Sequence, residues 1–235
     1  MASRVTLSRR WLTTATWPLG VTMTSWDYMW RTTVLRRTET VVAPGSDLAS
    51  PPPLPDAISR HRLQLEDGGH GPLFHRFYRV RIKQSDVSPM HLMGQVQSNL
   101  NLVCPTKFAR FVKVVGDDST MAPNDEYVVR MAGPWDGPVR VVDRTRTSFR
   151  LVTLTGHLEA GQIEFRARRD GQLVVEIESW ARSKDFVTNL LYHHLRMSKE
   201  VQLHMWISFL EKVVALAGGR IDCGVEIRTH RVADT

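Results

Sequence analysis

The clearest pattern in the chain is a series of five short segments in which hydrophobic and polar residues alternate. Alternation with a period of two is typical of strands that bury one face of a sheet. In chain order, the predicted strands are Glu126 to Met131, Pro138 to Arg144, Thr147 to Thr155, Gln162 to Arg168 and Leu173 to Arg182. The Asp170-Gly171 pair between the last two predicts a tight hairpin. The pattern therefore predicts an antiparallel sheet with one buried face and one polar face.

A further strand is predicted to begin at Phe74, where hydrophobic residues again alternate with basic ones. Two short helices are predicted after it. The first begins at Pro89 with Ser88 as its N-terminal cap, and the second opens at Pro105 and continues through Val112.

The pattern changes to a helical period from about Asp185 to Ala217, just before Gly218-Gly219, a natural helix stop. One strand, two short helices, a run of antiparallel strands and a long C-terminal helix is the element order of the helix-grip architecture. The sequence therefore predicts an α+β domain. In it, a curved antiparallel sheet wraps around the long helix and leaves an apolar ligand cavity between them.

Three segments follow from this pattern. Residues 1–71 are predicted to form a basic arm and a linker rich in proline and glycine, residues 72–217 the helix-grip domain, and residues 218–235 a C-terminal tail. Residues 1–83 hold 12 Lys and Arg against 6 Asp and Glu, whereas the rest of the chain holds 19 against 18. Because the domain is nearly neutral, a nucleic-acid partner is not expected.

The two cysteines, Cys104 and Cys223, are far apart and belong to no metal-binding motif. They fit a reducing compartment, so we expect a cytoplasmic protein without a disulfide framework, a metal or a cofactor. No segment approaches the roughly 20 apolar residues that a membrane span needs.

The first residues allow two interpretations. Arg9-Arg10 resembles a twin-arginine export start, but the segment after it is too polar for a signal peptide. Translation starting at Met23 is the alternative. Either start retains the aromatic residues Trp26, Tyr28 and Trp30, which we expect to dock onto the domain, to close its cavity or to contact another protein.

Two groups of residues resemble a known family. They are the run Thr153-Leu154-Thr155-Gly156-His157-Leu158-Glu159-Ala160-Gly161, then Phe165, and later Ser179-Trp180-Ala181-Arg182. The chain resembles, from about Phe74 to Leu216, the family called domain of unknown function 1990. That family is similar to the START and birch-pollen-allergen helix-grip proteins, which bind sterols, polyketides and other apolar ligands. The resemblance implies a helix-grip fold and a ligand cavity, but no established activity.

His157 and Glu159 are the candidate catalytic residues, because an imidazole and a carboxylate at this spacing can form a proton-transfer pair. A purely structural turn, with Gly156 and Gly161 at positive φ, is the alternative and the one we favour. Glu176 and Glu178, beside arginines, are interpreted as a solvated charge ladder.

Six residues are candidate ligand contacts. Trp135 lies in a stiff proline-glycine loop that can roof a cavity or cover a core edge. Trp180 and Arg182 lie at the junction of sheet and helix, where a cation stacked on the indole is the simpler interpretation. Polar residues also interrupt the apolar face of the long helix at His194, Ser198 and Gln202. They need hydrogen-bond partners, either from the sheet, from water or from a ligand.

The leading functional hypothesis is a binding module for an apolar or amphipathic small molecule, lipid-like or polyketide-like. One alternative is a cyclase- or hydrolase-type enzyme of the same fold that uses His157 and Glu159. Another is a protein-interaction domain that uses the tryptophan-rich arm.

Overall fold

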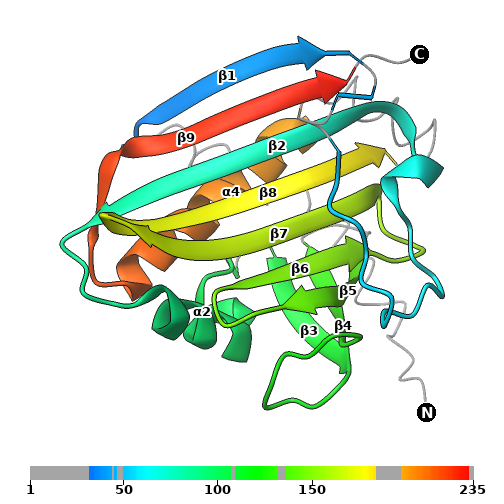
Figure 1. Ribbon diagram of the computed structural model, residues 1–235, viewed down its shortest axis with the longest axis horizontal. Coiled ribbons are helices and arrows are strands. Elements are labelled where there is room, and N and C mark those ends of the chain that lie inside the picture. The colour runs from blue at the N-terminus through cyan, green and yellow to red at the C-terminus, as the bar shows by residue number, and fades with distance from the viewer. Residues whose placement is uncertain are drawn as a thin grey trace, which may run out of the picture.

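In the part of the chain that the structure describes, nine strands form one curved sheet in the order β1-β9-β2-β8-β7-β6-β5-β4-β3, and helix α4 lies along one of its faces (Figure 1). The computed structural model describes residues 32–43, 45–46, 50–106, 109–131, 136–183 and 197–232. The strands are β1 Leu35–Val42, β2 His70–Lys83, β3 Ala109–Val115, β4 Glu126–Met131, β5 Asp136–Arg144, β6 Ser148–Thr153, β7 Glu159–Asp170, β8 Gln172–Ser183 and β9 Arg220–Val232. The helices are α2 Pro89–Ser98 and α4 Met197–Leu216, with short 3-10 turns η2 Glu66–Gly68 and η3 Leu100–Leu102. This arrangement is the predicted helix-grip α+β fold.

The five alternating segments are confirmed as β4 to β8, and β4 has the predicted bounds. The predicted hairpin joins β7 to β8, where Asp170 pairs with Gln172 and Gly171 has a φ of 66°. A non-glycine residue would be strained in that conformation. The segment beginning at Phe74 is confirmed as part of β2.

The first short helix is confirmed as α2. Pro89 occupies its first turn, and the Ser88 side chain accepts a hydrogen bond from the backbone N–H of His91 at 3.1 Å. A proline and a serine cap together satisfy the helix start, because proline has no N–H that needs a partner.

The second predicted helix is wrong. Residues from Ala109 to Val115 form β3, which pairs with β4 at the end of the sheet. The Asn101 side chain donates to the carbonyl of Phe111 at 2.8 Å and accepts from its N–H at 2.9 Å. Pairing with β4 on one side and the Asn101 amide on the other satisfy the backbone hydrogen-bonding groups of this segment. These contacts outweigh the helical spacing of its hydrophobic residues.

The sequence analysis did not predict β1 or β9, which lie in the segments it treated as an arm and a tail. β9 pairs antiparallel with β2, and β1 pairs parallel with β9. Val225 and Ile227 of β9 are 0% and 4% exposed and belong to the main core.

Helix α4 begins at Met197, and the first part of the predicted long helix lies outside the described residues. The hydrophobic period of the sequence predicts one buried arc, with Met205, Phe209 and Val213 inside it and His204 on the opposite, solvent-facing side. The structure buries a wider surface, since Trp206, Ile207 and Leu210 are buried although they fall outside that arc, and His204 is 4% exposed. The sheet curves around the helix, so more than one side of the helix meets protein. None of the helices in the described part of the chain is long and apolar enough to cross a membrane.

Residues 50–69, which we call the strap, cross the face of the sheet opposite α4 (Figure 1). Ile58 of the strap packs against Val142 and Val152. The buried Arg150 donates to the carbonyls of Pro52 and Pro53, both at 3.0 Å. Because this part of the strap forms no helix or strand, its carbonyls have no ladder partners, and the arginine supplies hydrogen bonds to two of them.

Candidate functional site

The sheet has a concave face that packs on α4 and an outer face that carries the strap. Side chains alternate between the faces along each strand. On β8, Leu173, Val175 and Ile177 belong to the core around α4. Trp180 and Arg182 have the other parity, so they lie on the outer face. The structure therefore separates them from Gln202, which projects from α4 toward the concave face.

A short chain of polar contacts links α4 to two strands across the concave face. Arg76 of β2 donates through Nη1 to Oε1 of Gln202 at 2.9 Å, and Gln202 donates through Nε2 to Oε2 of Glu159 at 2.9 Å. Arg76 is only 7% exposed, and its guanidinium lies 4.7 Å from the centre of the Phe74 ring. The concave face thus has a buried cation next to an aromatic wall.

Arg76 was missed by the sequence analysis, although the signal was present. The hydrophobic residues Tyr78, Val80 and Ile82 define the buried side of this strand, and Arg76 has the same parity. A basic residue on the buried side of an amphipathic strand identifies a polar group that needs a buried partner.

His157 is held by backbone atoms. The N–H of Glu159 donates to Nδ1 of the imidazole at 2.9 Å, which leaves the proton of the neutral ring on Nε2. Burial lowers the pKa of His157 below its ordinary value, more than the nearby Glu159 raises it. The Glu159 carboxylate is bound instead by Gln202. The two candidate catalytic groups therefore lie in one connection but are fixed by different partners.

The glycines around His157 have structural roles. Gly156 has a φ of 106° and Gly161 a φ of 157°. A Cβ at Gly161 would lie 1.9 Å from the carbonyl oxygen of Trp180, so no side chain fits there. The strap closes this connection, because Gln64 donates through Nε2 to the carbonyls of His157 and Glu159.

Trp180 stacks on the His75 imidazole, with ring centres 5.2 Å apart and planes at 4°. Arg182, which the sequence suggested as the cation on this indole, donates instead to the carbonyl of Gly71 at 2.9 Å. Trp180 is 4% exposed and packs with Leu73 and Val232. Both side chains therefore contact the first residues of β2.

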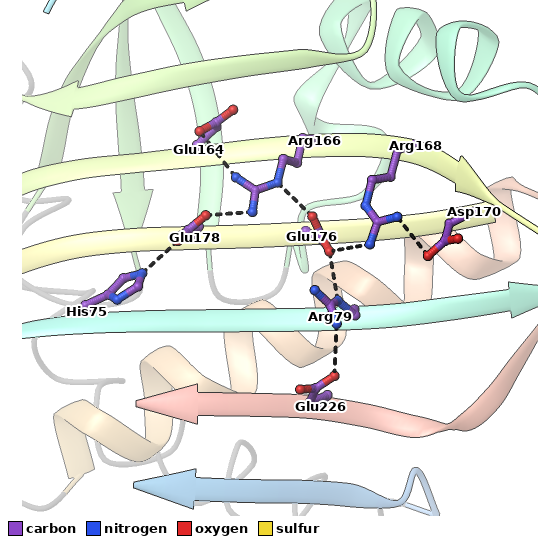
Figure 2. Close-up of polar contacts among 9 residues, drawn as sticks. All are labelled: His75, Arg79, Glu164, Arg166, Arg168, Asp170, Glu176, Glu178 and Glu226. Carbon is purple, nitrogen blue, oxygen red and sulfur yellow. Dashed lines mark hydrogen bonds and ion pairs between the residues drawn. The ribbon is translucent and has the colours of Figure 1, made fainter. Parts of the chain in front are cut away.

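The predicted charge ladder is present on the outer face (Figure 2). Glu176 is bound by Arg79 at 2.8 Å, by Arg166 at 2.7 Å and by Arg168 at 3.3 Å. The prediction that this carboxylate is solvated is wrong, because its side chain is 3% exposed. Burial alone would raise the pKa of Glu176, but its hydrogen bonds and charge interactions with Arg166 and Arg79 lower it below the ordinary value.

Three of the predicted ligand contacts are not placed by the structure. Trp135 and His194 lie outside the described residues, and Ser198 lies in α4 without a described side chain. A groove of about 340 Å³ lies on the strap, and its lining consists of Arg60, Leu63, Gln64, Leu65, Asp67 and Gly68. Within the described residues, no group of three or more His, Cys, Asp or Glu is placed to hold a metal ion.

A curved sheet packed around a long helix is the arrangement of a helix-grip protein. The comparison with known families agrees with the family resemblance described in the sequence analysis. Residues 106–211 match the model of a family described as a domain of unknown function, DUF1990. The match covers a little less than half of the chain and confirms the resemblance. No curated protein matches the chain.

Several solved structures are similar to the chain at low identity. The di-domain ARO/CYC protein StfQ from the steffimycin biosynthetic pathway has a TM-score of 0.45 and 12% identity, over 62% of this chain and 51% of that one. A norcoclaurine synthase point mutant from Thalictrum flavum has a TM-score of 0.44 and 8% identity, over 63% of this chain and 96% of that one. Ara h 8.0201 has a TM-score of 0.41 and 9% identity, over 61% and 97%. The chain thus spans about half the length of StfQ.

Proposed function

We propose that the protein binds an apolar or amphipathic small molecule between the concave face of the sheet and α4. The polar end of the molecule would lie at the Arg76, Gln202 and Glu159 contacts. One observation carries the proposal: a buried arginine on the concave face donates to a neutral amide from the helix and lies over an aromatic ring.

The size of the side chains along the concave face supports this location. Toward the C-terminal half of α4, large side chains fill the space, and Phe165 lies 5.2 Å from Phe209 and 4.7 Å from Phe149 between ring centres. Toward the start of α4, the inward residues of β8 are Ser179 and Ala181, which pair with Ile163 and Gly161 of β7. Large side chains therefore fill one end of the concave face, whereas Ser179, Ala181 and Gly161 lie at the other.

The chemistry of the polar chain indicates the kind of ligand. A guanidinium presents several N–H donors, so a carboxylate, sulfonate or carbonyl can replace or join the Gln202 oxygen on Arg76. The Phe74 ring and the neighbouring core supply apolar contacts for the rest of the molecule. Mostly apolar linings with a few convergent polar groups are typical of small-molecule sites.

Binding of anilinonaphthalene sulfonate tests the proposal, because this dye combines an anionic group with apolar rings. We expect the folded full-length protein to bind it, and Arg76→Gln to weaken the binding by about tenfold, the loss of one charged hydrogen bond. Arg81→Gln is the matched control, since Arg81 lies on the same strand but on the outer face, with a side chain 40% exposed.

Binding should be measured by fluorescence titration, with circular dichroism to show that each variant unfolds cooperatively. Equal loss in both arginine variants would contradict the proposed location. Native mass spectrometry of the purified protein provides a second measurement, in which a retained organic adduct is expected. A protein that binds no dye and retains no adduct would refute the proposed function.

A further inference from the structure

The strap contacts the sheet where strands β6 and β7 separate (Figure 1). These strands pair as far as Val152 and Gln162. The next residue of each strand bonds the strap: the backbone N–H of Gln64 donates to the carbonyl of Thr153 at 2.8 Å, and the carbonyl of Gln64 accepts from the N–H of Gly161 at 2.9 Å. The Thr153 hydroxyl donates to the same carbonyl at 2.7 Å. The backbone of Gln64 therefore lies in the fork between the two strands.

The side chain of Gln64 holds the connection between these strands. Its Nε2 donates to the carbonyl of His157 at 2.9 Å and to the carbonyl of Glu159 at 2.7 Å. An amide nitrogen has two N–H donors, and both are used here. A side chain from the strap, on the outer face, thus fixes the backbone on both sides of Leu158.

The Glu159 side chain points toward the other face of the sheet. Phe165, which has the same parity on β7, belongs to the core around α4, and side chains alternate between the faces along a strand. The Glu159 carboxylate accepts from Nε2 of Gln202 on α4 at 2.9 Å. Glu159 therefore receives a hydrogen bond from the strap at its backbone and one from the helix at its side chain.

We propose that Gln64 is a positioning residue for the polar end of the ligand site, although it belongs to the strap on the opposite face. This inference rests on the proposed function. By holding the carbonyl of Glu159, Gln64 keeps the carboxylate directed at Gln202. The Gln202 amide in turn presents its oxygen to Arg76. A ligand that meets side chains already ordered in this way does not have to order them on binding.

Gln97 of α2 offers an internal comparison. Its Nε2 donates to the carbonyls of Thr145 and Ser148 at 2.9 and 3.0 Å, so it holds the connection between β5 and β6 in the same manner. Its Oε1 accepts from Arg144 at 3.0 Å. These partners belong to β5, β6 and the turn between them. Gln97 therefore performs the structural part of the role of Gln64 without a link to Gln202.

Titration with anilinonaphthalene sulfonate tests the proposal on Gln64→Met and Gln97→Met. Methionine keeps the length of the side chain but has no N–H donor. Both variants should lower the melting temperature by roughly 4 °C, because each loses two hydrogen bonds. Gln64→Met should also weaken dye binding by about fivefold, since the ligand must order the released side chains again. Gln97→Met should leave dye binding within about twofold of the parent.

A double-mutant cycle shows whether Gln64 acts through Gln202. Gln202→Leu removes the hydrogen bond to Glu159, so adding Gln64→Met to it should change the dye affinity by less than about twofold. Two losses that multiply would mean that Gln64 affects binding by another route, and would overturn the proposal.

The imidazole of His157 provides a readout that needs no ligand. Burial lowers its pKa below the ordinary 6.5. If Gln64→Met releases the connection, NMR titration should show the pKa of His157 rising toward 6.5, whereas Gln97→Met should leave it unchanged. An unchanged pKa of His157 in Gln64→Met would show that the amide does not hold the connection.

Failure of this inference differs from failure of the proposed function. A parent protein that binds no dye and retains no adduct refutes both. If Arg76→Gln weakens dye binding but Gln64→Met does not, or if Gln97→Met weakens it equally, only the positioning role of Gln64 is refuted. Circular dichroism verifies that each variant is folded. Should Gln64→Met not fold, Gln64→Asn gives the same test, because it keeps the amide but is too short to reach both carbonyls.

Discussion

On the outer face of the sheet, the buried carboxylate of Glu176 is bound by three guanidinium groups (Figure 2). On the concave face, the buried guanidinium of Arg76 donates to the neutral amide of Gln202. In the first case, opposite charges from neighbouring strands neutralise each other within the protein. In the second, the described hydrogen bond comes from a neutral side chain of the helix. A network of opposite charges fixes its members strongly, whereas a hydrogen bond to a neutral amide is weaker than one between two charged groups.

The substitution Glu176→Gln should cause the largest loss of stability. Removing one member of a buried charge network leaves its partners without compensation. The three arginine side chains are 21%, 32% and 41% exposed, so water partly replaces the carboxylate. We expect a loss of about 2 to 3 kcal/mol in the free energy of unfolding, measured by denaturant titration.

Glu164→Gln is the control for this prediction. Glu164 lies 3.6 Å from Arg166 in the same network, and burial raises its pKa above the ordinary value. Since the charged form gains little there, neutralising it should change stability by less than about 0.5 kcal/mol. Equal effects of the two substitutions would contradict the central role of Glu176.

The same network predicts a dependence on acid. The pKa values of Glu176 and Glu178 are lowered from the ordinary 4.5, despite burial, by hydrogen bonds and charge interactions with Arg166 and, for Glu178, with His75. The unfolded chain therefore takes up protons first as the pH falls. Stability should be fully present above pH 4.5 and decrease below it, by about 1 to 2 kcal/mol before both groups are protonated in the folded state.

Unfolding titrations between about pH 5 and about pH 3 measure this decrease. The double variant Glu176→Gln, Glu178→Gln should show a flatter profile in that range. Glu66 and Glu164 have raised pKa values, with burial as the main cause. Their contribution is present below pH 4.5 and is lost as the pH rises above it, so the two effects lie in different ranges. A parent profile as flat as that of the variant would contradict the assignment.

His157→Gln should reduce stability by about 1 kcal/mol, the contribution of one buried hydrogen bond. Because burial lowers the pKa of His157, the parent should lose stability as the pH falls below the ordinary value of 6.5, and the variant should lose less. The enzyme alternative expects something different: on an identified substrate, turnover should fall by about 100-fold with stability unchanged. That outcome would favour a catalytic role over the structural one.

Gln202→Leu should change stability only slightly, by about 0.5 kcal/mol, because leucine adds apolar contacts that offset the lost hydrogen bonds. Binding of anilinonaphthalene sulfonate should nevertheless change, since the side chain between Arg76 and Glu159 is replaced. Denaturant titration and dye titration of the same sample measure both. If Gln202→Leu destabilises the protein as much as Glu176→Gln, the proposed difference between the two faces is wrong.

The sequence alone determined the elements whose pattern is local. Alternation of hydrophobic and polar residues was sufficient for β4 to β8, since burial of one face needs no knowledge of the neighbouring strand. The Asp170-Gly171 hairpin and the Ser88 cap were predicted for the same reason, because a positive φ and an unsatisfied helix start are properties of a few adjacent residues. Val225 and Ile227 carried a similar signal for β9, which was overlooked.

Other features were decided only by the tertiary structure. β1 has no alternation of burial and is a strand because β9 supplies its hydrogen bonds. β3 carries helical spacing but lies where β4 needs a partner. The polar chain from Arg76 through Gln202 to Glu159 joins residues 43 and 126 positions apart. Periodicity identifies which face of an element is buried, but contacts between distant elements depend on how the sheet curves around the helix, which no local pattern records.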